Sequence, residues 1–98
     1  MANSIRLPNF SVDTDAAVVS GGGWLAEITV RNNNAAAQTT TIYDNSSAAA
    51  PILVQVEVPA NNTIHLLFAG GRGNPGRNFG TGLYFDVGSD STVTGRLA

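Results

Sequence analysis

The chain has no cysteine and no lysine, and only 12% of its 98 residues are charged. The missing cysteines exclude disulfides, thiol catalysis and thiolate metal sites. The charged fraction is about half of the ~25% usual for a globular domain. Free-standing cytosolic proteins normally rely on mixed surface charge for solubility, so this surface suits a protein that packs against copies of itself or a partner. The alternative is an independent, weakly charged β domain.

Long apolar runs and excess positive charge are also missing. The formal net charge is −2, whereas a protein that binds nucleic acid is expected to carry a basic patch. The first residues, "MANSIRLPNFSVDTD", contain no apolar stretch typical of a secretory signal, and no run approaches the ~18 residues of a membrane span. We therefore expect neither nucleic acid nor a membrane as a partner.

Residue types that carry catalysis are few and scattered. The single histidine, His65, falls on the outward side of a predicted strand, where a surface or interface role is expected. Asp13 with Asp15, and Asp86 with Asp90, have oxygen ligands suited to Ca²⁺, but their spacing matches no EF-hand and solvated turns are the preferred interpretation. We expect no catalytic residue, no metal site and no cofactor, and hence no enzyme.

A glycine-rich segment, "GGRGNPGRNFG", stands out near the middle of the second half. A phosphate-binding P-loop needs GxxxxGK[ST], and this segment has neither the lysine nor a following helix. A long surface loop with left-handed backbone at its glycines fits better. Arg72 and Arg77 are predicted at the tip of this loop, either solvated or gripping a partner's carboxylate in a bidentate pair.

Apolar residues recur with period two along most of the chain, which is typical of β-strands. Seven strands are predicted, at residues 16–20, 24–31, 38–44, 52–58, 63–68, 82–87 and 92–97. Pro51 and Pro59 bracket the clearest of them. Turn signals every 8–12 residues indicate an all-β, antiparallel sandwich of about seven strands, either jelly-roll or immunoglobulin-like.

The same alternation predicts which side chains face inward. Inward positions include Trp24, Ala26, Ile28 and Val30 in one strand and Ile52, Val54, Val56 and Val58 in another. Five apolar residues are predicted to point outward, and together they would mark an interface if they formed one patch: Leu25, Tyr43, Leu53, Leu67 and Tyr84.

The first 14 residues fit the alternation poorly because Pro8 interrupts them. Their apolar residues are Ile5, Leu7, Phe10 and Val12. Two interpretations stay open, namely an extended N-terminal arm that reaches a neighbouring subunit and an edge strand of the same domain. The sandwich domain is predicted over residues 15–98.

Three longer stretches carry a family resemblance: "VVSGGGWLAEITVRNNNAAAQTTTIYDN", "PILVQVEVPANNTIHLLF" and "FGTGLYFDVGSDSTVTGRL". In their order they resemble small β-sandwich virion proteins of tailed bacteriophages, over residues 16–98. Such proteins include capsid decoration or cement proteins, head fibres and neck or tail adaptors. The resemblance carries over no catalytic residue.

The resemblance implies a virion structural protein at the capsid surface, which binds the major capsid protein as a homo-oligomer, taken as a trimer. The apolar arm and the low surface charge, rather than the resemblance, lead us to predict contacts at Ile5, Leu7, Phe10, Arg72 and Arg77. One alternative is a neck or tail connector or appendage. Another is a carbohydrate- or receptor-binding module in which Trp24, Tyr43 or Tyr84 stacks on a sugar. The inward position predicted for Trp24 counts against that role.

Overall fold

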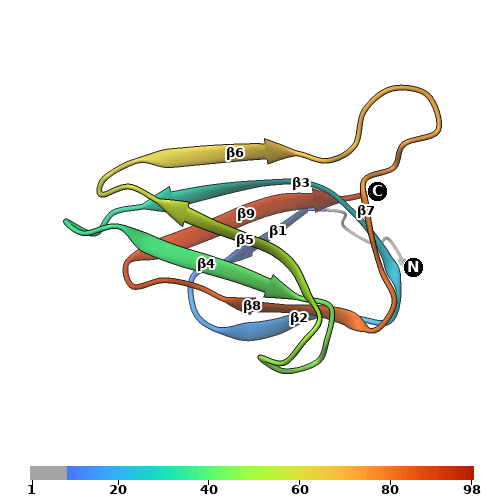
Figure 1. Ribbon diagram of the computed structural model, residues 1–98, viewed down its shortest axis with the longest axis horizontal. Helices are drawn as coiled ribbons and strands as arrows, with labels where there is room; N and C mark the ends of the chain where they lie inside the picture. Colours follow the sequence, from blue (N-terminus) through green and yellow to red (C-terminus); the bar gives the residue numbers. More distant parts are fainter. Residues whose placement is uncertain (1–8) are drawn as a thin grey trace, which may run out of the picture.

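Two antiparallel sheets pack face to face and form a β-sandwich (Figure 1). A computed structural model describes residues 9–98, and nine strands lie within this range. The strands are β1 (Asn9–Val12), β2 (Ala16–Ser20), β3 (Gly23–Asn32), β4 (Gln38–Tyr43), β5 (Ile52–Val58), β6 (Thr63–Leu67), β7 (Arg77–Phe79), β8 (Gly82–Asp86) and β9 (Ser91–Leu97). The predicted all-β antiparallel sandwich is confirmed, with β1 and β7 in addition to the seven predicted strands. No helix in residues 9–98 has the length and apolar character needed to cross a membrane.

The strand pairing is nested. One sheet has the order β1-β9-β3-β6, with β7 also paired to β3, and the other has the order β2-β8-β4-β5. The first strand therefore lies beside the last, β2 lies beside β8, and the inner pairs are β3 with β6 and β4 with β5. Along one edge of β3, β7 pairs with Gly23–Leu25 and β6 pairs with 27–31. Strand β7 has only three residues inside the glycine-rich stretch, too few for a period-two pattern.

The core fills the space between the two sheets. Its central side chains come from alternate positions of β3, β8 and β9, including Ile28, Leu83, Phe85 and Val93, each with 0% of its surface exposed. The inward positions predicted for β8 and β9 are confirmed, as are those of Ala26, Ile28 and Val30 in β3. Partly buried residues complete the layer: Phe10, Val19, Leu53, Val56, Ile64, Leu66, Phe68, Val87 and Leu97.

Two register shifts overturn parts of the predicted alternation. In β3, the pairing with β9 shifts between Leu25 and Glu27, so Leu25 and Ala26 are both buried and Trp24 is 40% exposed. In β4, the pairing with β5 shifts between Ile42 and Tyr43, and Ile52 on the partner strand is 53% exposed. A β-bulge adds one residue to a strand and changes the phase of its alternation. The predictions that Trp24 and Ile52 point inward are therefore wrong.

The five residues predicted as an outward apolar patch do not form one. Leu25 is fully buried and Leu53 packs against the core, so neither is available on the surface. Leu67 is 62% exposed on β6, in the five-stranded sheet. Tyr43 and Tyr84 pair with each other in the four-stranded sheet, with ring centroids 6.4 Å apart. The surviving members thus lie on different sheets.

The edge-strand interpretation of the N-terminal segment holds for residues 9–12. Strand β1 pairs with β9, and Phe10 packs against Phe85 with ring centroids 5.1 Å apart. Gly95, opposite Phe10, leaves room for its ring, since a Cβ there would clash with Phe10 Cζ. The sandwich therefore begins before residue 15. Ile5 and Leu7 lie outside the described residues.

Candidate interaction surfaces

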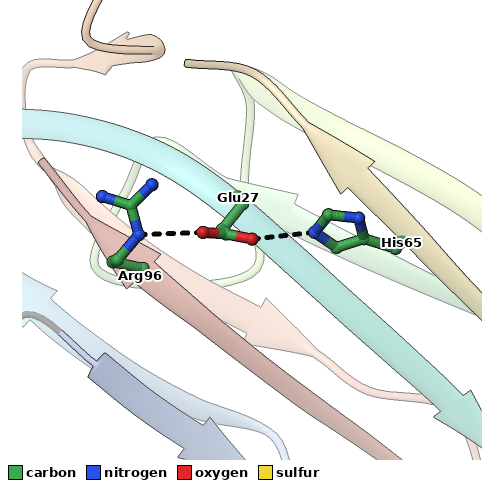
Figure 2. A network of polar contacts seen from close by, with 3 residues as sticks. All are labelled: Glu27, His65 and Arg96. Carbon is green, nitrogen blue, oxygen red and sulfur yellow. Dashed lines mark hydrogen bonds and ion pairs between the residues drawn. The ribbon is translucent and has the colours of Figure 1, made fainter. Parts of the chain in front are cut away.

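The outer face of the five-stranded sheet carries a three-residue polar network centred on Glu27 of β3 (Figure 2). His65 Nε2 on β6 lies 2.8 Å from Glu27 Oε1, and Arg96 Nε on β9 donates to Oε2 at 2.8 Å. These hydrogen bonds, first from His65 and then from Arg96, hold the pKa of the Glu27 carboxyl below its usual range. Both carboxylate oxygens are thus engaged, and the network ties three neighbouring strands together.

His65 is therefore a surface residue, as predicted, but its partners were not foreseen. The sequence signal was present in the outward positions of the strands, because Glu27 lies opposite Arg96 in the antiparallel register and His65 lies diagonally across from Glu27. Recognising it requires knowing that β3 lies between β6 and β9. The side chains of His65, Glu27 and Arg96 are 49%, 30% and 44% exposed, and ion pairs at such exposure contribute little to stability.

The glycine-rich segment forms the predicted surface loop, which projects beyond the sheets between β6 and β7 (Figure 1). Gly71 and Gly73 have φ of 70° and 74°, and the loop is closed by a hydrogen bond from Gly70 N to Asn74 O. At its base, Gly76 has φ of 122° and approaches β3 so closely that a Cβ would meet the Leu25 carbonyl. Only glycine fits that position.

The two arginines of this segment have different surroundings. Arg72 is exposed within the loop, as predicted. Arg77 is not at the tip but begins β7, where its guanidinium donates to the Leu53 carbonyl at 3.2 Å and lies 5.3 Å from the ring centroid of Phe68. These contacts join β7 to β5 of the opposite sheet. Arg77 thus supports the base of the loop, and Arg72 is the arginine that the loop presents.

A hollow of about 240 Å³ opens at the end of the sandwich where β3 begins and β9 ends. It is lined by Val19, Ser20, Gly22, Gly23, Trp24, Phe79, Leu97 and Ala98. Its lining residues come from both sheets. The partly exposed Trp24 ring makes this end of the molecule a candidate docking site, which the sequence did not indicate because Trp24 was predicted to be buried.

The aspartates considered for Ca²⁺ binding lie in turns and at the end of β8. Asp15 accepts a hydrogen bond from Val87 N at 2.8 Å, so it supports the end of β8. Asp13 and Asp90 do line a wide, open hollow, where Asn34 donates to Asp90. Within residues 9–98, no group of three or more histidine, aspartate or glutamate side chains is arranged to hold a metal ion.

Asp44, at the end of β4, clamps the turn between β7 and β8. Its carboxylate accepts hydrogen bonds from the backbone N–H groups of Gly80 at 2.9 Å, Thr81 at 2.8 Å and Gly82 at 3.3 Å. The bond from Gly80, followed by that from Thr81, lowers the pKa of Asp44 from its ordinary value near 3.8. A carboxylate whose pKa is lower in the folded state stabilises the fold when it is charged.

We expect the Asp44→Asn variant to be less stable than the wild type at neutral pH, with a difference that shrinks on acidification. The Asp44 carboxylate makes its full contribution to stability above the pKa that the group has in the unfolded chain. This contribution is lost as the pH falls through the lower pKa of the folded state. Urea unfolding at a series of pH values measures the difference. Asp13→Asn, which removes an exposed carboxylate elsewhere, is the matched control. If the difference in the free energy of unfolding stayed constant from neutral pH to about pH 2, stabilisation of the turn by the charged Asp44 carboxylate would be contradicted.

Comparison of the chain with protein-family models, with curated protein sequences and with solved structures finds no match. The function is therefore inferred from the residues and geometry of this chain.

Proposed function

We propose that this protein is a non-enzymatic structural component of a bacteriophage virion, which decorates the capsid by binding the major capsid protein. The observation that carries the proposal is the ordered resemblance of residues 16–98 to small phage virion proteins. The first resembling stretch spans most of β2 and then β3 and β4, the second spans β5 and β6, and the third spans β8 and β9. Within each stretch, the successive strands lie in opposite sheets, so the resemblance covers whole strands and the connections that cross from one sheet to the other.

The strand order supports the proposal. Nested pairing, with β1 beside β9 and β2 beside β8, is the arrangement of a jelly roll and favours that type over an immunoglobulin-like sandwich. Jelly rolls occur in viral capsid proteins, but also in lectins and cupins. A fold by itself does not specify a function, so the strand order adds to the resemblance and does not replace it.

The projecting loop supplies the polar contact in this proposal. Arg72 is exposed there, and a guanidinium binds a carboxylate through two parallel hydrogen bonds. Arg77 serves indirectly, through its contacts to Leu53 and Phe68 at the base of the loop. Phe10 packs within its own domain, and the predicted contacts at Ile5 and Leu7 fall outside the described residues. Association as a closed symmetric oligomer, taken as a trimer, is the expected assembly.

Quantifying this chain in purified particles tests the proposal. A decoration protein is present in copies proportional to the capsid subunits and is released without opening the neck or tail. A small number of copies at a single vertex would favour the neck or tail connector instead. Absence from the particle, or catalytic turnover by the purified chain, would refute a structural role.

The Arg72→Ala variant tests the contact itself. Loss of one charge-assisted hydrogen bond pair of about 1.5–3 kcal/mol weakens binding at least about tenfold, so occupancy on undecorated capsids should fall at limiting protein concentration. Ala48→Glu changes the net charge by the same amount on a different exposed loop and is the matched control. If Arg72→Ala and the wild type occupied the capsids equally, Arg72 would not be part of the interface.

A further inference from the structure

Strand β5 leaves one of its two edges open. It ends the four-stranded sheet and, among residues 9–98, pairs only with β4. Proteins usually protect such a row of free backbone N–H and C=O groups with lysine, proline, a bulge or a very short strand. Strand β5 has seven residues and contains neither lysine nor proline. Its register shift lies between Ile52 and Val54, so residues 54–58 form a regular edge.

A hydrogen bond at the end of β4 fixes which residues of β5 face this open edge. Asp44 N donates to the Pro51 carbonyl at 2.9 Å, so the N–H of Asp44 points to the β5 side of β4. In an antiparallel pair, every second residue directs its N–H and C=O to the same neighbour. The even-numbered residues of β4 therefore face β5, and they lie opposite the even-numbered residues of β5. The backbone groups of Gln55 and Glu57 thus point to the open edge.

Both ends of this edge are closed to further pairing. Arg77, which belongs to the other sheet, donates to the Leu53 carbonyl at 3.2 Å and occupies the edge at that point. At the other end, Pro59 follows the strand and has no N–H to donate. The free part of the edge is therefore residues 54–58.

A second copy of β5 fits this segment in one antiparallel register. With Val56 on a two-fold axis, Gln55 of each copy lies opposite Glu57 of the other, and the two residues exchange backbone hydrogen bonds. The same register sets Leu53, whose carbonyl is already engaged, opposite Pro59, which lacks an N–H. An axis at Glu57 would instead set two carboxylates directly opposite each other. An axis at Gln55 would set Glu57 opposite the engaged Leu53.

We propose that this protein forms a two-fold dimer by antiparallel pairing of β5 with β5 of a second copy, which joins the two four-stranded sheets into one. The Gln55 amide donates to Thr41 Oγ1 at 3.0 Å and has a second hydrogen for the Glu57 carboxylate of the other copy. Among residues 9–98, Glu57 has no ion-pair partner of its own. The dimer does not depend on the virion role, and a trimer there would use a different, head-to-tail contact.

Charge at position 55 tests this register. The contact is small, so we expect a reversible dimer whose fraction rises with the concentration of the full chain in sedimentation equilibrium. Gln55→Glu sets a second carboxylate opposite Glu57 and should raise the dissociation constant of the dimer several-fold, whereas Gln55→Lys should lower it several-fold. The double variant Gln55→Glu/Glu57→Lys should restore the dimer. Urea unfolding confirms that each variant is folded.

Thr94→Glu and Thr94→Lys are the matched controls for these variants. They make the same changes in net charge at an exposed position of β9, in the other sheet, and should leave the dissociation constant unchanged. A wild type that stays monomeric at every concentration would overturn the proposal. Equal effects of the substitutions at positions 55 and 94 would also overturn it.

Cysteine cross-linking checks the register independently, since the chain has no native cysteine. A mixture of the single variants Gln55→Cys and Glu57→Cys should form disulfide-linked dimers on mild oxidation, because the Cα atoms of opposite residues lie about 5.5 Å apart. Each variant alone should form few, because identical residues then lie on a diagonal of about 7–8 Å. If either variant alone links as fast as the mixture, or if the mixture does not link, the proposed pairing is wrong.

Discussion

Replacement of Asn32 by leucine should lower the free energy of unfolding by about 3 kcal/mol, because buried carbonyls lose their donor and the bulkier methyl groups of leucine, on a side chain of the same branching, cannot replace it. Asn32 has 0% of its surface exposed. Its Nδ2 donates to the carbonyls of Ala36 at 2.9 Å, Val58 at 3.0 Å and Pro59 at 3.2 Å. Its Oδ1 accepts a hydrogen bond from Asn34 N at 2.8 Å.

This single side chain joins the end of β3 to the 33–37 turn and to the end of β5. For a domain of this size, a loss of 3 kcal/mol corresponds to a melting temperature lower by about 12–24 °C. Urea unfolding and thermal melts measure the effect. Asn62→Ala is the matched control, because Asn62 is exposed and donates only locally, to Ala60 O. A loss below about 1 kcal/mol for Asn32→Leu would show that water or a rearranged turn replaces these bonds.

A second variant of the same residue separates hydrogen bonding from size. Asn32→Asp keeps the shape but removes the Nδ2 donors and sets a carboxylate against three carbonyl oxygens at neutral pH. We expect it to be at least as destabilising as leucine at pH 7. The loss in its free energy of unfolding relative to the wild type should become smaller in acid, where the protonated carboxyl again offers a hydrogen-bond donor.

Removal of the Phe85 ring should lower the free energy of unfolding by about 3–5 kcal/mol, the usual cost of a phenylalanine-to-alanine change in a core. Phe85 is fully buried on β8 and lies opposite Ile42, another fully buried residue. Across the sandwich, its ring packs against Phe10 of β1. The change therefore leaves a cavity between the two sheets and weakens the attachment of the edge strand.

Tyr84→Ala is the matched control for Phe85→Ala, since Tyr84 is the adjacent residue of the same strand and is only half-buried, beside Tyr43. In chemical denaturation, Tyr84→Ala should lower the free energy of unfolding distinctly less than Phe85→Ala does. A double-mutant cycle of Phe85→Ala with Phe10→Ala measures the coupling of the two rings, expected at about 0.5–1.5 kcal/mol for an aromatic pair. Independent, additive effects would argue that β1 does not pack on the core through Phe10.

The period-two pattern was sufficient to predict the class of fold and most strands. In β8 and β9 the alternation continues unbroken, and Leu83, Phe85 and Val93 face the core as predicted. It failed where an extra residue enters a strand. Because inward and outward side chains alternate with a period of two, one bulge reverses the assignments on one side of it relative to the other. In β3, Ile28 and Val30 beyond the shift face the core as predicted, whereas Trp24 and Leu25 before it are exchanged.

The polar assignments failed for a different reason. Asn32 is the first of three consecutive asparagines in "RNNN", and only the fold makes its side chain a buried hydrogen-bond donor to the far end of β5. Arg77 and Arg72 are equally basic in sequence and both are exposed, yet pairing of β7 with β3 brings Arg77 to the Leu53 carbonyl and leaves Arg72 in the loop. Hydrogen-bond partners that are 24 or 26 residues apart depend on strand order, which alternation does not specify.

The amino-acid sequence by itself determined the strand-forming class of the chain, the absence of thiol chemistry and the surface position of the glycine-rich loop, because these follow from local backbone preference and composition. Only the tertiary structure decided the nested strand order, the Glu27–His65–Arg96 network and the open hollow at Trp24. Those features arise where strands distant in sequence become neighbours, and the free energy that selects the neighbours belongs to the whole packed core rather than to any local segment.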